Sequence, residues 1–174
     1  LYENTIIIFA GDNGLAVGQH GLMGKQNVYE HSVGVPLMIK AAAQHTGKKT
    51  ADLCYLIDVF PTLCDMLQLP VPQSVDGVSL LPSLDGKGPV RDYLYYSYMD
   101  NQRSISDGTW KLIEYHVNGK RTTQLFNLKN DPWEMNDLSG QKKYRKTILH
   151  LREKMTEKQK RTNDTSVFWN NFSY

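Results

Sequence analysis

The stretch from Thr5 to Gly14 reads TIIIFAGDNG and indicates the fold class of this chain. Its first six residues form a continuous apolar and largely β-branched run, which is typical of a strand buried on both faces of a sheet. The run ends at a turn-forming cluster that places the side chains of Asp12 and Asn13 at the carboxyl end of the strand. Ligands of open α/β sheets bind at that end. The stretch therefore predicts an α/β protein with a candidate site at Asp12 and Asn13.

The segment after this turn carries further polar candidates. Residues 15–34 are rich in Gly and polar residues without clear periodicity, and a long irregular loop in a compact domain is usually functional. Asp12 and Asn13 offer hard oxygen ligands that suit Ca²⁺ or Mg²⁺. Lys25 could bring a cation to an anionic oxygen held by the same metal, and His20 could donate a hydrogen bond or shuttle a proton. The alternative is a purely structural turn, in which Asp12 and Asn13 bind nearby backbone amides.

Residues 35–88 continue the α/β pattern. Val35–Lys40 predicts a second short strand, and Asp58 has the character of a helix N-cap followed by apolar residues at helical spacing. Cys54 and Cys64 make neither a disulfide framework nor a metal cluster, and we expect both to be buried as small apolar side chains. Seven Pro and Gly residues interrupt residues 70–90, so we expect a domain boundary there, with one domain over 1–88 and a second over 89–174.

The second domain is expected to be a small α+β unit. Four short strands are predicted over 93–98, 103–106, 109–115 and 122–127, and the pairs Asp107-Gly108 and Asn118-Gly119 favour tight hairpin turns. A helix is predicted over 142–161, with its apolar face at Tyr144, Ile148, Leu151 and Met155. An antiparallel sheet with one packing helix follows from this pattern.

Composition is that of an ordinary globular protein, with 40% hydrophobic and 22% charged residues. Residues 1–85 hold four basic against eight acidic residues, a balance of −4, whereas residues 86–174 hold sixteen against ten, a balance of +6. The basic half indicates either an anionic partner or a solvated basic helix. The longest apolar run is too short to cross a bilayer, so we expect no membrane span. We expect no nucleic-acid partner.

Five motifs in the same order resemble the type I sulfatases of the alkaline-phosphatase superfamily. The first two are the TIIIFAGDNG stretch and the segment GQHGL followed by GKxxxYE and VPL. The others are listed by residue range: DVFPTL at 58–63 with DGVSL at 76–80, WKLI at 110–113, and LFNLKNDPWE at 125–134. The match covers nearly all of residues 4 to 160. It implies the C-terminal part of an alkaline-phosphatase-like α/β domain followed by a small antiparallel subdomain.

The resemblance also implies roles for individual residues. In the family the acidic and amide residues after the strand ligate a divalent cation, usually Ca²⁺, and these positions match Asp12 and Asn13. The Lys of the GKxxxYE segment contacts the sulfate ester, which points to Lys25 as a catalytic and substrate-binding residue. His20 is expected in or beside the site, with a purely structural part as the alternative. The implied substrate is a sulfated small molecule or sulfated carbohydrate, and the implied location is periplasmic, secreted or lysosomal.

Two parts of the family's active site, the nucleophile and an acidic pair of metal ligands, are not found in this chain. The family's formylglycine arises from Cys or Ser in a C/S-x-P/A-x-R setting, and neither Cys54 nor Cys64 has that setting. An acidic pair that completes the metal site also precedes the D-N-G strand in family members. The chain begins at Leu1 and enters a strand almost at once, so we expect a C-terminal fragment that lacks the N-terminal part of its own catalytic domain. Alone, it should have no turnover and at best weak metal binding.

Two alternatives stay open. Phosphodiesterases and phosphonate monoester hydrolases of the same superfamily share related metal motifs, although Asn13 favours a single-calcium sulfatase site. A non-catalytic binding or assembly module is the alternative from another class, but it would leave the D-N-G to G-K segment without a purpose. Arg103, Asp107, Trp110 and His116 lie in turns and hairpins and are not assigned to the site. Trp110 is expected in the sheet core, with Arg103 and Asp107 as surface partners.

Overall fold

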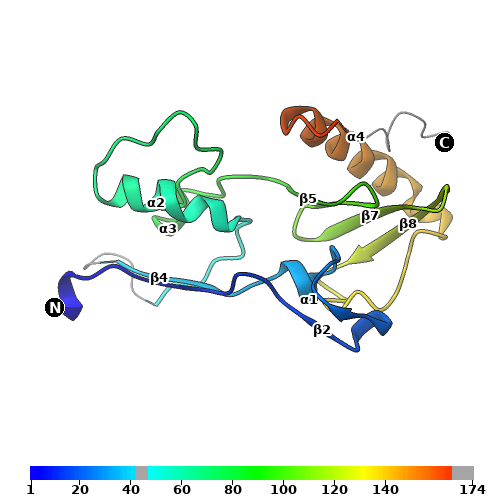
Figure 1. The fold of residues 1–174 in the computed structure, drawn as a ribbon, viewed down its shortest axis with the longest axis horizontal. Helices are drawn as coiled ribbons and strands as arrows, with labels where there is room; N and C mark the ends of the chain where they lie inside the picture. Colours follow the sequence, from blue (N-terminus) through cyan, green and yellow to red (C-terminus); the bar gives the residue numbers. More distant parts are fainter. Residues whose placement is uncertain (42–46, 166–174) are drawn as a thin grey trace. The chain divides into compact units, whose positions relative to one another are not determined.

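The computed structural model describes residues 1–41 and 47–165, and these form two compact units (Figure 1). The first unit contains Leu1–Asp12 and Val35–Leu94, and the second contains Asn13–Gly34 and the chain from Tyr95 onward. The segment that carries the candidate residues His20 and Lys25 therefore groups with the C-terminal half of the sequence rather than with its neighbours. The proposed division into domains at residues 88 and 89 stays a prediction about the complete protein.

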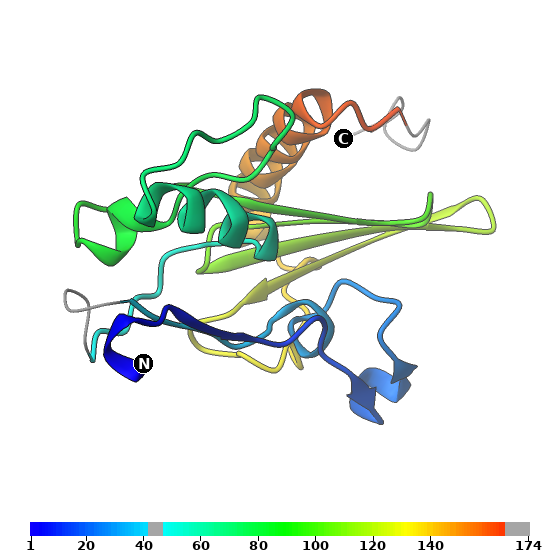
Figure 2. The ribbon, with the colours of Figure 1, turned by 60° about the vertical axis from the view of Figure 1, so that its left-hand side comes forward.

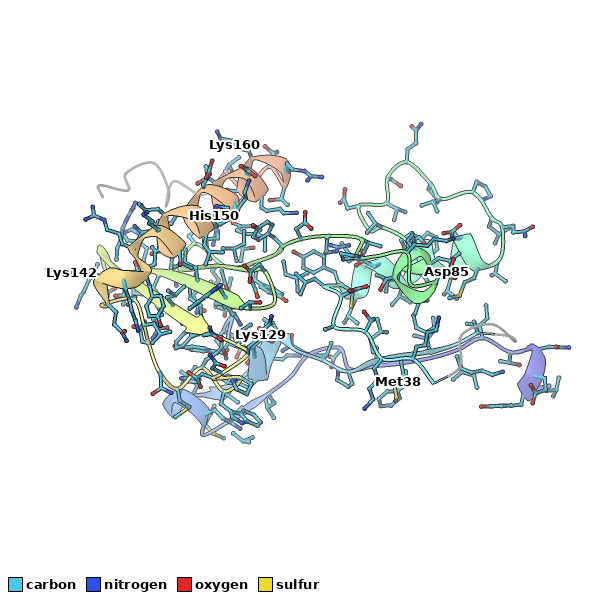
Figure 3. All side chains as sticks on the ribbon, turned by 180° about the vertical axis from the view of Figure 1, so that it is seen from behind. Met38, Asp85, Lys129, Lys142, His150 and Lys160 are labelled. Atoms are coloured by element: carbon cyan, nitrogen blue, oxygen red, sulfur yellow. The ribbon has the colours of Figure 1, made fainter. Side chains whose placement is uncertain are left out.

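The first unit opens with a two-stranded antiparallel sheet. After a short 3-10 helix, η1 (Tyr2–Asn4), strand β1 (Ile7–Ala10) pairs with β4 (Leu37–Lys40) in the register Ile8 to Ile39. Both strands are where the sequence predicts them. The expected burial of β1 on both faces is wrong for the described residues, since Ile7 is 43% and Phe9 57% exposed. Met38 on β4 is exposed as well (Figure 3). A sheet of two strands has no second layer here to cover these apolar side chains.

Helices complete the first unit, and Asp58 ties them together. The short helix η3 (Leu56–Asp58) leads into α2 (Val59–Met66), and α3 (Leu81–Leu84) follows. Asp58 stands at the predicted N-cap position, but its fully buried carboxylate makes no capping bond to α2. It accepts hydrogen bonds from the backbone N–H groups of Tyr55 at 2.7 Å and Val78 at 2.9 Å, and from the Arg91 guanidinium at 2.5 Å. A buried charge needs such partners to offset its lost hydration.

Both cysteines of the first unit are free thiols. Cys64 lies on α2 and is buried, as expected, whereas Cys54 precedes η3 and is only half-buried. Burial raises the pKa of the Cys54 thiol, so it stays protonated at neutral pH.

The second unit is built on a four-stranded antiparallel sheet, as the sequence predicts. Its strands lie in the order β5 (Leu94–Tyr98), β6 (Gln102–Ser106), β7 (Trp110–Val117) and β8 (Lys120–Asn127). Asn118 and Gly119 both have positive φ, at 52° and 75°, between the paired residues Val117 and Lys120. This is the primed turn that an Asn-Gly pair favours.

One face of this sheet packs against the long helix α4 (Arg145–Arg161), which follows the short η4 (Lys142–Tyr144) (Figures 1 and 2). Ile148, Leu151 and Met155 are buried, as their helical spacing predicts. Two ion pairs connect the helix region to the sheet. The guanidinium of Arg152 on α4 lies 2.7 Å from the carboxylate of Glu114 on β7, and that of Arg103 on β6 lies 2.7 Å from the carboxylate of Asp164, which follows the helix. On the side away from the sheet, exposed basic side chains follow one another along η4 and α4, among them Lys142 on η4 and Lys160 on α4 (Figure 3).

The opposite face of the sheet is covered by residues 13–34. This segment was expected to lack regular structure, but it holds the strand pair β2 (Ala16–Val17) and β3 (Met23–Gly24), the short helix η2 (Gln19–Gly21) and helix α1 (Glu30–Val33). Val28 and Tyr29 pack on Ile113 and Phe126 in a shared apolar core. These elements are too short for hydrophobic periodicity to reveal them.

Candidate functional site

The D-N-G turn is shaped by a close backbone approach. Gly14 donates its N–H to the carbonyl oxygen of Ser32 at 2.9 Å, and a Cβ at Gly14 would lie 2.1 Å from the carbonyl oxygen of His31. Only glycine fits there. Asp12 and Asn13 directly precede it and are both exposed, and Asn13 donates its side-chain N–H to the Gly14 carbonyl at 3.0 Å. The turn thus presents a carboxylate and an amide at the end of β1.

His20 is held in a strained backbone conformation. Its φ of 54° lies in the left-handed region, which costs a non-glycine residue on the order of 1 kcal/mol. The imidazole stacks on Tyr29, with ring centroids 4.0 Å apart, and its Nε2 lies 3.1 Å from the Trp133 carbonyl oxygen. Because a carbonyl only accepts, Nε2 carries the proton in this bond. In the tautomer that carries its proton on Nε2, Nδ1 is the acceptor.

Lys25 lies on an exposed, glycine-shaped turn of the second unit. Gly24 before it has a φ of 106°, and a Cβ at Gly24 would lie 2.9 Å from the Gln26 side-chain oxygen. That same oxygen accepts the backbone N–H of Lys25 at 3.2 Å, and the Lys25 carbonyl accepts the N–H of Asn27 at 2.9 Å. The structure therefore brings Lys25 and His20 onto one segment, 13–34, over one face of the sheet.

A buried ion cluster anchors this segment to the sheet. Lys111 on β7 is fully buried, and its ammonium lies 2.8 Å from a carboxylate oxygen of Glu30 and 3.0 Å from one of Glu134. The backbone N–H of Glu30 donates to the other Glu134 oxygen at 2.6 Å. Burial raises the pKa of Glu134, and the Lys111 ammonium opposes that rise. The cluster joins three stretches that are far apart in sequence. It fixes the position of α1, which begins five residues after Lys25.

His31 extends this group of polar side chains. Its Nδ1 lies 2.9 Å from the Ser32 hydroxyl, and its ring centroid lies 5.5 Å from that of His20. The pKa of His31 is lowered by burial first, and then by the positive charges of His20 and Lys111.

We expect His31 to titrate with a midpoint below the ordinary value of 6.5. Between that midpoint and pH 6.5 the unfolded chain binds more protons than the folded chain, so folding stability falls as the pH drops through this window. A titration of the imidazole resonances by NMR tests this, with the His31→Asn variant to assign the signal and the urea-unfolded chain as reference. A folded-state midpoint at or above 6.5 would contradict it.

Sequence reasoning missed five residues of this region: Tyr29, Glu30, His31, Lys111 and Glu134. Four of them belong to segments that it singled out as motifs, namely Tyr29, Glu30, Lys111 and Glu134. Nothing in a linear sequence indicates that residues separated by 81 and 23 positions meet in one buried cluster. Charged residues inside otherwise apolar strand or motif positions were the available signal, because such residues are buried only when they are paired.

The unassigned candidates of the second unit have structural parts. Arg103 is buried, at 2% exposure, and paired with Asp164, so its expected surface position is wrong. Asp107 accepts the N–H groups of Thr109 and Trp110 at 2.8 and 2.7 Å and shapes the turn before β7. Trp110 is half-buried and its ring lies 5.3 Å from that of Tyr144.

The fit of Asp12 and Asn13 to a cation is incomplete by itself. Ca²⁺ takes six to eight oxygen ligands, and these two residues supply a carboxylate and an amide oxygen of the right chemistry. Over residues 1–41 and 47–165 no group of three or more His, Cys, Asp or Glu side chains is arranged to hold a metal. A Ca²⁺ ion at these two residues would need further ligands from elsewhere.

Comparison with known proteins gives consistent matches. The family described as N-sulphoglucosamine sulphohydrolase, C-terminal, matches residues 18–161. The N-acetylglucosamine-6-O-sulfatase of Bacteroides thetaiotaomicron is 30% identical over an alignment 175 residues long, and the alignment covers 93% of this chain and 31% of that protein. The chain thus spans about a third of the length of this relative.

Within residues 1–41 and 47–165, none of the helices has the length and apolar character needed to span a bilayer.

Solved structures agree in fold. A protein solved in complex with its substrate D-glucosamine-2-N,6-O-disulfate matches with a TM-score of 0.78 and 29% identity, over 97% of this chain and 37% of that chain. The phosphonate monoester hydrolase of Agrobacterium radiobacter matches with a TM-score of 0.75 and 26% identity, over 92% and 36%. The expected fold class, the C-terminal part of an alkaline-phosphatase-like α/β protein with an antiparallel subdomain, is confirmed.

Proposed function

The chain belongs to the N-sulphoglucosamine sulphohydrolase C-terminal family, and from that premise we propose that the complete protein hydrolyses sulfate esters of saccharides. The observation that carries this proposal is the segment 13–34. It presents His20 and Lys25 together, and an ion cluster around the fully buried Lys111 anchors it to the sheet. Burying the charges of Lys111 and Glu134 costs free energy because each loses its hydration, so holding this segment in place has a cost that a functional role would explain.

The roles that we propose follow from the chemistry of each side chain. Lys25 places an ammonium against the sulfate ester and stabilises the negative charge that develops as the alcohol leaves. His20, with its Nε2 proton donated to Trp133 in the structure, offers Nδ1 as an acceptor for a substrate or water proton. Asp12 and Asn13 would hold one Ca²⁺ together with ligands from the rest of the protein. When bound, that ion would neutralise charge on the sulfate oxygens.

The nucleophile and the remaining metal ligands would come from the part of the complete protein that lies outside this chain. We therefore propose that residues 1–174 alone do not turn over. A periplasmic, secreted or lysosomal location is proposed from the family alone.

A second candidate reaction is phosphonate or phosphate diester hydrolysis, because a phosphonate monoester hydrolase shares the fold at a TM-score of 0.75. Asn13 argues against the two-metal form of that chemistry. Such sites use charged and imidazole ligands to hold a second cation, whereas an amide contributes no charge.

The test is to purify the complete protein with Ca²⁺ and measure product release from two substrates. We expect inorganic sulfate from D-glucosamine-2-N,6-O-disulfate, and little or no phenol from phenyl phenylphosphonate. Turnover of the phosphonate ester alone would replace the proposed function by the second candidate. Turnover of neither substrate by a folded, calcium-loaded protein would favour a non-catalytic module.

A further inference from the structure

A cavity of about 660 Å³ opens on the sheet face of the second unit that lies opposite α4. Strand register explains its wall: Gln102 on β6 faces Tyr115 on β7, and Tyr115 faces Thr122 on β8. Side chains that are paired across strands point to the same face, so this row forms one side of the cavity. His20 and Gln26 from the segment 13–34 line the other side. The cavity thus lies beside the loop that carries Lys25.

The floor of the cavity is aromatic and hydrogen-bonded. The Tyr29 hydroxyl donates to the Gln124 side-chain oxygen at 2.7 Å, and the Tyr115 hydroxyl forms a hydrogen bond with Tyr29. Burial, followed by this bond to Tyr29, raises the pKa of Tyr115, so its hydroxyl stays protonated at any physiological pH. Tyrosine rings bordered by amides suit a sugar ring, which presents apolar C–H groups on its faces and hydroxyls around its edge.

One polar atom in the wall lacks a partner. The side-chain oxygen of Gln102 is buried and accepts no hydrogen bond from any of the described residues. A buried acceptor left unsatisfied destabilises the folded state and calls for an explanation in a native protein. Because Gln102 lines the cavity, a turn of its amide toward a bound hydroxyl would relieve that cost. A hydroxyl-rich ligand therefore matches this wall.

The charge of the cavity lining favours an anionic ligand. Lys120 stands at the cavity beside the Asn118-Gly119 turn, with its side chain exposed, and none of the residues that line the cavity is acidic. We propose that this cavity binds an anionic sugar unit next to the sulfated sugar of an oligosaccharide substrate, with Lys120 pairing to its carboxylate or sulfate. This inference rests on the proposed function, since it extends the substrate away from Lys25. It makes Lys120 and Gln102 determinants of specificity for longer chains.

Calorimetric titration of the complete protein tests the inference with two ligands. One is D-glucosamine-2-N,6-O-disulfate, and the other is a heparin tetrasaccharide, which joins such units to uronic acids. Lys120→Met is expected to weaken tetrasaccharide binding about tenfold, the size typical of a hydrogen bond to a charged group, and to leave monosaccharide binding unchanged. Gln102→Ala should weaken it by about threefold to tenfold. The control is Lys129→Met, which removes an exposed lysine of the same unit that does not line the cavity (Figure 3).

The outcomes separate this inference from the proposed function. Unchanged tetrasaccharide binding in both cavity variants overturns it, as does an equal loss for both ligands or an equal loss in the Lys129→Met control. Absence of sulfate release by the wild-type protein would contradict the proposed function. The difference in tetrasaccharide affinity between the wild type and the cavity variants would still decide whether the cavity holds an anionic sugar. Thermal unfolding of the variants at the wild-type temperature shows that the loss of binding is not a loss of fold.

Discussion

Replacing Lys111 by Met is expected to destabilise the second unit by about 3–5 kcal/mol, the usual cost of removing one partner from a buried ion pair. The change leaves the carboxylate of Glu134, whose side chain is 1% exposed, without its compensating charge, and leaves Glu30 without a partner on β7. Glu134 already has a pKa that burial raises, and the variant removes the ammonium that opposes this rise.

The variant should therefore be less destabilised in acid. With a raised carboxyl pKa the folded state binds more protons than the unfolded state above pH 4.5, so stability falls as the pH rises through that window. Guanidinium unfolding followed by tryptophan fluorescence at several pH values measures both effects. Lys129→Met is the matched control, because Lys129 is exposed, and should change the free energy of unfolding by less than about 0.5 kcal/mol.

A double variant separates the charge from the shape. Adding Glu134→Gln to Lys111→Met replaces the stranded carboxylate by a neutral amide that can still accept the N–H of Glu30. We expect it to recover a large part of the lost stability, which would give a coupling energy of the size found for residues in one network. A loss below about 1 kcal/mol in Lys111→Met, or strictly additive effects in the double variant, would show that the cluster does not hold the segment.

Replacing Lys25 by Ala in the complete protein is expected to lower kcat about 100- to 1,000-fold, as loss of a group that stabilises transition-state charge usually does. Lys25 is exposed on a turn shaped by Gly24, and its backbone bonds to Gln26 and Asn27 do not involve its side chain. The substitution should therefore leave the fold intact. Sulfate release from D-glucosamine-2-N,6-O-disulfate measures the effect.

Two comparisons make this result specific to Lys25. Lys25→Arg keeps the charge and should retain more activity than Lys25→Ala, while Lys49→Ala removes an exposed lysine of the first unit and should have no effect. Bound calcium, measured by atomic emission, should be equal in all three variants. Wild-type kcat in Lys25→Ala would remove this residue from the catalytic residues, and lost calcium would assign it to the metal site instead.

Local pattern was sufficient for most elements of the fold. The four strands of the second unit and its Asn118-Gly119 turn lie where alternation and turn chemistry predict them, and Ile148, Leu151 and Met155 are buried on α4. These features depend on near neighbours along the chain, which a sequence displays directly. The family resemblance rested on five such local motifs and is confirmed by the match over residues 18–161.

Long-range features were beyond that kind of reasoning. Pattern predicted β1 to be buried on both faces, but in the described residues it pairs only with β4, and Phe9 is 57% exposed. The N-cap at Asp58 was recognised by residue type, whereas its actual partners are Tyr55, Val78 and Arg91. The burial of β1 depends on a covering layer, and the role of Asp58 depends on partners distant in sequence. The periodicity of a sequence contains no information about either.

The sequence by itself determined the family, the order of the elements and the chemistry available at Asp12, Asn13, His20 and Lys25, because each depends on residue type and short spacing. Only the tertiary structure decided that the segment 13–34 folds with the C-terminal sheet, and that Glu30, Lys111 and Glu134 meet beneath it. The physical reason is that burial and pairing of charge are properties of three-dimensional neighbours. From sequence alone, a lysine in a strand is expected at the surface. Its burial becomes possible only because the fold brings two carboxylates next to it.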